Sequence, residues 1–289
     1  MHPLRRSHYE AFYFLHILLV PPFLVVAGLH HPPVWYWCWV ALGLWIGERL
    51  WRATWWLSNN GYFGGMTPSV QLHQSVPVRQ LKRASVSSHF RVPFEPIYLP
   101  PTGYAHAELL SGRTVRLRYI SPGPFSWAPG QHFLINIPSV SRFTSHPFTA
   151  ATVCDERSGD SGRELVFLGR AKKGWTKELW DTVVKLMARH QSHPPGERPT
   201  KGTEAPPRGV LMRMYVDGPF GSSVRARWGS HSTVLIVAGG SGVSFGLSIL
   251  EFMSMCLSGR DGKHLGGWGN KSFLTARVRF VWLVREFCK

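Results

Sequence analysis

The sequence predicts a membrane α-helical hairpin, followed by an antiparallel β-barrel and then an α/β nucleotide-binding unit. Three observations carry this prediction: two apolar segments near the N-terminus, short alternating strands separated by turn residues, and a strand, a glycine turn and an apolar helix in direct succession. The predicted parts are residues 1–57, a partial membrane domain of about two helices; 58–101, a linker; 102–228, the barrel; and 229–289, a partial nucleotide-binding domain.

The predicted hairpin rests on two apolar segments. Residues 11–29 form an uncharged run, and residues 34–51 form a second one that includes Glu48 and Arg49 near its end. A membrane-spanning helix takes about 20 mostly apolar residues. His-His-Pro-Pro at 30–33 predicts the turn, because proline disfavours helix both at its own position and at the preceding one.

Basic residues at both ends predict the orientation of the hairpin. Arg5 and Arg6 precede the first segment, and Arg49 and Arg52 lie at the end of the second. The positive-inside rule then places both ends, and the soluble region that follows, in the cytosol. A secretory signal is the alternative, and the second Trp-rich segment argues against cleavage.

The first apolar segment carries His16 and His30. On a helix these positions lie about 40° apart around the axis and roughly 21 Å apart along it. Neutral imidazole is a good axial ligand of haem iron, and polar side chains within a bilayer usually serve a function. The alternative is that His30, next to His31, lies at the membrane interface. Pro21 and Pro22 predict a kink between the two histidines.

The chain is strongly basic, with a formal net charge of +17. Such a charge suits an anionic membrane surface or phosphorylated ligands. The basic residues form no stripe interleaved with aromatics at helical spacing, so we expect no nucleic-acid partner. The four cysteines lack a C-x-x-C pair, which favours free thiols over a zinc site or a disulfide framework.

The barrel is predicted from alternating strands at residues 114–119 and 132–137, with Pro- and Gly-containing turns between them and a further strand at 165–168. A segment near 190–208 is loaded with Pro, Gly and charge and is expected to be a disordered loop.

The nucleotide-binding unit is predicted from the strand at residues 233–238, the Gly-Gly-Ser-Gly turn at 239–242 and the apolar helix at 243–256. In such units the glycines let backbone amides approach a pyrophosphate, and the helix N-terminus favours negative charge. A strand at 277–284 is expected to pair parallel to the first. A simple glycine-rich loop is the alternative.

Several segments, in this order along the chain, resemble the fungal ferric reductases, relatives of the NADPH oxidases. The segments are Tyr9-Glu-Ala-Phe-Tyr-Phe-Leu-His16, Pro129-Gly-Gln-His132, Ser145-His-Pro-Phe-Thr149, Gly174-Trp-Thr176, Gly218-Pro-Phe-Gly221, Val237-Ala-Gly-Gly-Ser-Gly-Val243 and Phe280-Val-Trp-Leu-Val-Arg285. The resemblance covers most of the chain from Tyr9 onwards, and it implies that the barrel and the nucleotide unit form a ferredoxin-reductase-like module.

The resemblance also implies which residues bind cofactors. FAD would be held by His146, Pro147, Phe148 and Thr149, with its diphosphate near Arg170, Gly174, Trp175 and Thr176. The NADPH pyrophosphate would lie on Gly239, Gly240, Ser241 and Gly242, with Gly218, Pro219 and Gly221 as the lip of the cleft, and Arg285 is a candidate for the 2′-phosphate. His16 and His30 would each bind one of two stacked haem b groups. The alternatives are a basic surface turn for Lys172 and Lys173 and a solvated charge for Arg285.

By the same resemblance the protein would be an integral membrane protein of the plasma membrane with its soluble domain in the cytosol. It would act as an NADPH-dependent ferric-chelate reductase, passing electrons through FAD and haem to ferric or cupric ions or chelates. No catalytic residue is assigned, since the electron steps need no acid or base. The alternatives are a superoxide-forming NADPH oxidase-like enzyme, and a catalytically incomplete fragment that acts only as a membrane binding protein.

The chain departs from this family in two respects. The family's membrane domain has six or more spans with two histidines per haem, whereas one such helix is visible here, so His31, a second copy or another membrane subunit would have to supply the remaining ligands. The family also continues beyond the segment of Arg285 with a Cys-Gly segment, and Cys288 comes too early to be that cysteine. We therefore expect an N- and C-terminally truncated member.

Overall fold

The computed structural model describes residues 9–62, 100–101, 103–121, 125–142, 144–155, 163–191, 209–221, 227–267 and 273–284. Arg5, Arg6, Arg285, nearly all of the predicted linker and the segment 192–208 lie outside the described residues. The chain divides into two compact units, Met1–Ser58 and Asn59–Lys289.

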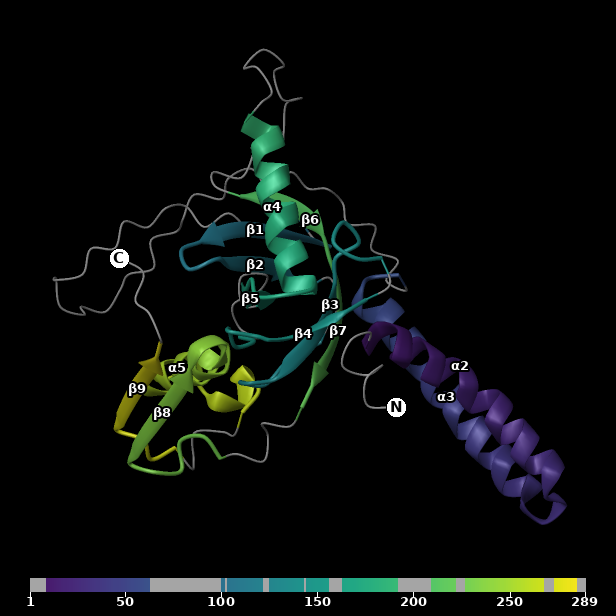
Figure 1. Ribbon diagram of the computed structural model, residues 1–289. Helices are drawn as coiled ribbons and strands as arrows, with labels where there is room; N and C mark the ends of the chain where they lie inside the picture. Colours follow the sequence, from purple (N-terminus) through teal and green to yellow (C-terminus); the bar gives the residue numbers. More distant parts are fainter. Residues whose placement is uncertain are drawn as a thin grey trace, which may run out of the picture. The chain divides into compact units, whose positions relative to one another are not determined.

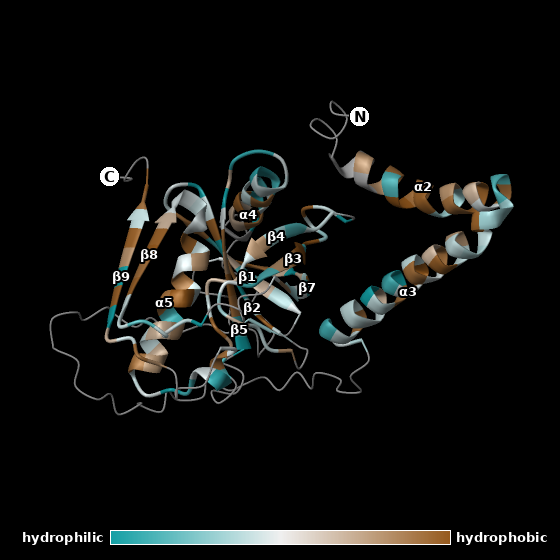
Figure 2. Ribbon diagram, turned by 90° about the horizontal axis from the view of Figure 1, so that it is seen from below, coloured by the Kyte–Doolittle hydropathy of each residue, from teal (hydrophilic) through white to brown (hydrophobic). Residues whose placement is uncertain are grey.

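The first unit is a helical hairpin, as predicted (Figure 1). Helix α2 (Tyr9–His30) continues through Pro21 and Pro22, a short 3-10 turn η1 (Pro32–Val34) follows, and helix α3 (Trp35–Asn59) runs back. Helix α3 continues beyond residue 51, the end of the predicted apolar segment, and the added turns carry Trp55. Hydropathy colouring shows apolar residues along both helices (Figure 2).

Length and composition alone single out one helix of the described chain as able to cross a membrane, Gly240–Leu257, and this helix is partly buried in the second unit. Phe14–His30 is apolar but shorter. Many large apolar side chains of α2 and α3 are exposed, including Leu18, Phe23 and Leu29 on α2 and Leu44 on α3. Membrane crossing by the hairpin therefore stays a prediction.

The second unit begins with two antiparallel sheets. Their strands are β1 (Tyr104–Leu110), β2 (Thr114–Ile120), β3 (His132–Asn136), β4 (His146–Thr149), β5 (Glu164–Arg170), β6 (Val210–Arg213) and β7 (Tyr215–Phe220). One sheet has the order β5-β2-β1-β6 and the other the order β4-β3-β7. Both sheets contribute to one apolar core, in agreement with the predicted barrel.

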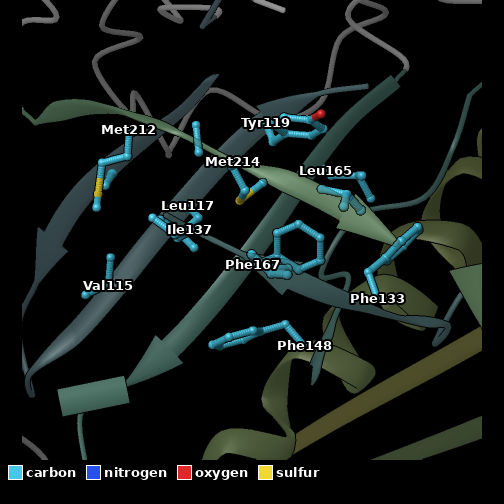
Figure 3. Close-up of a cluster of buried hydrophobic side chains, with 14 of the residues drawn as sticks. Val115, Leu117, Tyr119, Phe133, Ile137, Phe148, Leu165, Phe167, Met212 and Met214 are labelled. Atoms are coloured by element: carbon cyan, nitrogen blue, oxygen red, sulfur yellow. The ribbon is translucent and has the colours of Figure 1, made fainter. Parts of the chain in front are cut away.

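Strand alternation builds this core. Val115, Leu117 and Tyr119 are the buried positions of β2, and Leu165 and Phe167 are those of β5. Side chains that alternate in this way line one face of a sheet. Figure 3 shows side chains of β2, β3, β4, β5 and β6 gathered in a single cluster.

Helix α4 (Trp175–Gln191) is also part of this core. Trp175, Leu179 and Val183 are buried at a spacing of four residues, and they therefore lie on one face of the helix. The Phe133 ring meets Phe167 edge-on at 5.9 Å within the same cluster.

The nucleotide unit has the predicted order of strand, glycine turn, helix and strand. It consists of β8 (Thr233–Gly239), the 3-10 turn η3 (Gly240–Gly242), α5 (Val243–Leu257) and β9 (Arg277–Leu283). Strands β8 and β9 pair in parallel, as expected. Close packing of α5 on the sheet requires Gly246, where a Cβ would lie 2.6 Å from the Phe280 ring.

Hydrogen bonds between described residues join the barrel to the nucleotide unit within the second unit. The Gly130 N–H donates to Ser248 Oγ (2.9 Å), and the Val153 N–H donates to Glu251 Oε2 (3.0 Å). Arg260 donates to the buried carboxylate of Asp155 at 2.7 Å. Helix α5, which begins at the glycine turn, is thus held against the strands that carry the predicted flavin residues.

Candidate functional site

Strand β4 brings aromatic rings together at the predicted flavin site. His146 and Phe148 lie two residues apart, and in an extended strand such residues point to the same side. The His146 ring stacks on Trp175 with centroids 5.3 Å apart, and the Phe148 ring lies 5.7 Å from the same indole. Pro147 is exposed and Thr149 half-buried on the alternate side. Of the predicted residues, His146, Phe148 and Trp175 therefore form one contact cluster.

Trp175 begins helix α4 directly after the turn at Gly174. Gly174 adopts φ +57°, a left-handed conformation that favours glycine, and its carbonyl accepts the first hydrogen bonds of the helix from Lys177 and Glu178. The Trp175 side chain is only 8% exposed, and its buried indole N–H has no hydrogen-bond partner in the described chain. A buried donor without a partner costs about 1–3 kcal/mol, so this N–H is suited to a bound acceptor.

Burial sets the protonation of His146. Desolvation lowers the pKa of this imidazole, and its hydrogen bond with the Pro147 carbonyl (3.2 Å) partly offsets the effect by favouring the charged form. The ring is therefore neutral near pH 7, and an uncharged ring lies against the indole.

Positive charge surrounds the start of α4. Arg170 ends β5, and Lys172 and Lys173 are exposed in the turn that follows. Thr176 stabilises this turn, because its Oγ1 accepts from the Lys172 N–H and donates to the Lys173 carbonyl, both at 3.3 Å. The exposed basic side chains and the amides of the helix N-terminus together suit a diphosphate. Thr176 itself is already engaged by the turn.

The glycine turn opens α5 with free space over its backbone. A Cβ built on Gly239, Gly240 or Gly242 would meet nothing within 4 Å, and Gly240 adopts φ +51°. Ser241 is exposed, and no side chain caps the helix N-terminus. Trp282 of β9 donates from Nε1 to the Gly240 carbonyl at 3.0 Å and so fixes the turn. Open glycines with uncapped amides fit a pyrophosphate.

The predicted lip, residues 218–221, consists of the last three residues of β7 and the residue that follows. Gly218 packs so closely on Phe133 that a Cβ there would lie 2.8 Å from the ring, and its peptide bond to Pro219 is cis. Gly221 is exposed, and its carbonyl accepts a hydrogen bond from Gln131 Nε2 at 2.6 Å. Gln131 follows Gly130, which is bonded to Ser248 of α5, so the lip and α5 are joined through this turn.

His16 and His30 lie on α2 in the first unit, and both side chains are exposed. The His16 ring stacks on Phe12 with centroids 5.8 Å apart. Among the described residues, no group of three or more His, Cys, Asp or Glu side chains gathers as a metal-ion site. The haem assignment of the two histidines stays a prediction.

Sequence reasoning missed the residues that hold the site together: Asn59, Asn60, Gln131, Ser248 and Glu251. Gln131 belongs to the quoted Pro129-Gly-Gln-His132 segment, which was a usable signal for it. The others act through hydrogen bonds to residues distant in the sequence, which no local pattern indicates.

Comparison with known proteins identifies the barrel. A model of the FAD-binding domain family matches residues 102–224. The chain is 25% identical to NADPH oxidase 5 of Homo sapiens over 199 residues (62% of this chain, 25% of the relative). It is 26% identical to ferric/cupric reductase transmembrane component 2 of Saccharomyces cerevisiae over 243 residues (83% and 25%). The chain thus matches about a quarter of the length of these relatives.

Two further similarities are a plant relative and a solved structure. A probable respiratory burst oxidase homolog protein I of Arabidopsis thaliana is 23% identical over 255 residues (84% of this chain, 22% of the relative). The ferredoxin NADP+ reductase of Neisseria gonorrhoeae, solved with FAD and NADP, superposes with a TM-score of 0.33 at 11% identity over 52% of each chain. Residues 102–224 thus match FAD-binding domains in sequence, and the homologues of the chain include NADPH oxidases, plant respiratory burst oxidases and a yeast ferric/cupric reductase component.

Proposed function

We propose that this chain is the flavin-dependent part of a membrane oxidoreductase that passes electrons from NADPH through FAD and haem to ferric or cupric ions. The observation that carries the proposal is the buried, unpartnered indole N–H of Trp175 against His146 and Phe148, inside a domain that matches FAD-binding domains. The open glycine turn at the head of α5 supplies the second nucleotide site that such a reaction needs.

Each group of residues at the predicted flavin site would have its own role in binding FAD. Phe148, Trp175 and the neutral His146 ring offer an apolar and aromatic wall to the flavin, while Arg170 and the start of α4 neutralise its diphosphate. Pro147 and Thr149 flank the wall on β4. Bound FAD supplies the chemistry, because it accepts a hydride as an electron pair and releases electrons singly.

The glycine turn would hold NADPH. Gly239, Gly240, Ser241 and Gly242 present backbone amides at the N-terminus of α5, which favours the negative pyrophosphate. Trp282 holds the turn in place by donating to Gly240. The bonds between barrel and α5 keep the two nucleotide sites at a fixed separation, which hydride transfer requires.

The first unit would lie in the plasma membrane, with the second unit in the cytosol. The exposed apolar side chains of α2 and α3 suit lipid contact, and the basic Arg49 and Arg52 near the end of α3 suit the cytosolic face. His16 and His30 would hold one haem each, and the remaining ligands would come from His31, a second copy or another membrane subunit.

An absorbance spectrum of the detergent-purified chain, before and after addition of NADPH, tests the proposal. We expect a flavin band at about 450 nm that bleaches with NADPH. A Soret band that shifts at the same time would support the haem route through the hairpin. Protein that stays colourless when FAD is supplied would overturn the proposal and favour a binding protein without electron transfer.

A superoxide-forming oxidase is the second candidate, because NADPH oxidases 4 and 5 are among the relatives. The metalloreductase is favoured by Arg142-Phe-Thr directly before Ser145-His-Pro-Phe-Thr149, and by the Pro-rich insert. Parallel assays of ferric-chelate reduction and superoxide release, on the same flavin-loaded preparation, separate the two. Superoxide release that superoxide dismutase abolishes, without iron reduction when oxygen is removed, would favour the oxidase.

A further inference from the structure

Strand β7 lies at the edge of the β4-β3-β7 sheet, and side-chain amides occupy its backbone groups. Asn60 makes two such bonds with Val216: its Nδ2 donates to the carbonyl, and its Oδ1 accepts from the N–H, both at 3.1 Å. Asn59 Nδ2 donates to the Gly218 carbonyl at 2.9 Å, and Asn59 is only 3% exposed. Gln131 Nε2 donates to the Gly221 carbonyl at 2.6 Å. We name Asn59, Asn60 and Gln131 the amide clamp.

An edge strand needs partners for its backbone groups, and satisfying them is one purpose of such bonds. The amide clamp does not only satisfy the edge strand. Its hydrogen bonds reach Val216, Gly218 and Gly221 in turn, and so they include the lip and the residue that follows β7. Gly221 adopts φ +85° and glycine has the greatest backbone freedom, so the lip depends on external bonds for a single conformation.

The clamp also connects the lip to the helix that carries the glycine turn. Gln131 is fixed at both ends of its amide, since its Oε1 accepts from the Ala128 N–H at 2.7 Å. The preceding residue, Gly130, donates its N–H to Ser248 of α5, and a Cβ on Gly130 would lie 2.5 Å from the Phe245 ring. Ser248 in turn donates to the Phe245 carbonyl at 2.8 Å. The lip is therefore held relative to the first turns of α5.

We propose that the amide clamp positions the lip so that the cleft accepts the nicotinamide nucleotide, and that Asn60 and Gln131 thereby set nucleotide affinity. None of the three side chains needs to touch the nucleotide, so they are positioning residues. The inference rests on the proposed function, because it assumes that NADPH binds between the lip and the glycine turn.

The experiment uses the full chain in detergent, loaded with FAD, with NADP+ as the probe. The variants are Asn60→Ala, Asn60→Asp and Gln131→Met, the last being close in shape to glutamine and without hydrogen-bonding groups. The matched control is Asn136→Ala, because Asn136 Nδ2 also donates to two backbone carbonyls, those of Ser141 (3.2 Å) and Thr144 (2.9 Å), away from the lip. Hydrogen exchange of residues 215–221, the Kd for NADP+, the limiting rate of flavin reduction and Tm are measured for each.

We expect Asn60→Ala and Gln131→Met to weaken NADP+ binding about five- to tenfold, as the loss of one or two neutral hydrogen bonds does. The rate of flavin reduction at saturating NADPH should change less than the Kd. Exchange of residues 215–221 should rise in Asn60→Ala, because the Val216 N–H loses its acceptor, and stay near wild type in Asn60→Asp, which keeps that acceptor. Asn136→Ala should lower Tm without changing the Kd for NADP+.

The possible outcomes distinguish a failure of this inference from a failure of the proposed function. Faster exchange at residues 215–221 with an unchanged Kd would overturn the inference alone, since the clamp would then only stabilise the edge of the sheet. An equal rise of the Kd in Asn136→Ala would also overturn it. A wild-type chain that holds FAD but binds no NADP+ would overturn the NADPH step of the proposed function, and the inference with it.

Discussion

Trp175 has a buried indole N–H without a hydrogen-bond partner in the described chain, next to the rings of His146 and Phe148. Trp175→Phe keeps an aromatic ring next to His146 and Phe148, removes the indole N–H and leaves a smaller ring. We expect FAD binding to weaken about five- to tenfold, because the ligand loses one donor. The unfolding free energy of the FAD-free protein should change by less than ~1 kcal/mol, because the removal of an unsatisfied buried donor offsets the packing lost with the smaller ring.

Flavin fluorescence titration and chemical denaturation measure the two quantities for Trp175→Phe. Trp180→Phe on the same helix is the matched control, since Trp180 is only half-buried at the margin of the core. Equal FAD affinity in wild type and Trp175→Phe would show that the indole N–H does not serve the cofactor.

Helix α5 contributes a half-buried carboxyl, that of Glu251, to the contact with the barrel. Burial raises the pKa of Glu251 above its ordinary value, the nearby Glu164 raises it further, and the hydrogen bond from the Val153 N–H opposes the rise. The folded state therefore binds more protons than the unfolded state as pH rises above 4.5, and this group's contribution to stability falls with rising pH. Glu251→Gln keeps an acceptor for Val153 and removes the charge.

We expect Glu251→Gln to raise Tm at pH 7 by a few degrees, about 2–4 °C for each kcal/mol gained, and the gain to vanish as pH approaches 4. Thermal unfolding followed by circular dichroism at several pH values measures this. Glu251→Leu is the contrasting variant, because it leaves the buried Val153 N–H unsatisfied and should destabilise by about 1–3 kcal/mol. A Glu251→Gln variant that is less stable than wild type at pH 7 would contradict the argument.

Helices and strands with a regular local pattern could be predicted from the sequence, whereas a strand that depends on long-range pairing could not. The alternation in β2 and β3 and the order of β8, the glycine turn and α5 were visible, because these signals lie within a few neighbouring residues. Strand β7 was not predicted, since it contains Gly218 and Pro219 and owes its extended form to pairing with β3. Helix α4 was also missed, although its buried positions follow a helical spacing.

The candidate site likewise contains residues that the sequence indicated and residues that it did not. The resemblance named His146, Phe148 and Trp175, and the structure brings these three into contact. Asn60 could not be found in this way, because its partner Val216 lies 156 positions away along the chain. The resemblance implied that Thr176 lies near the diphosphate, and in the structure its hydroxyl donates to the Lys173 carbonyl of its own turn.

Among the described residues, exposed apolar side chains gather on two surfaces of different character. One is the hairpin of α2 and α3, and the other is the face of the β8-β9 sheet turned away from α5. On that face Leu235, Val237, Val281 and Leu283 are exposed, Val237 by 59%, next to Arg279. Exposed apolar patches of this kind promote association unless another surface covers them.

Substitutions at two neighbouring residues on opposite faces of β8 test whether the face that carries Val237 is exposed to solvent. Val237→Lys should leave flavin absorbance and Tm near wild type and reduce association of the detergent-purified protein, because it places charge on exposed surface. Ile236→Lys should unfold the nucleotide unit, since Ile236 is only 8% exposed and packs in the core with Ile249 and Phe252. Size-exclusion chromatography with light scattering and thermal unfolding measure both variants. If Val237→Lys were as destabilising as Ile236→Lys, that face would have to be buried in the folded protein by a layer packed on it.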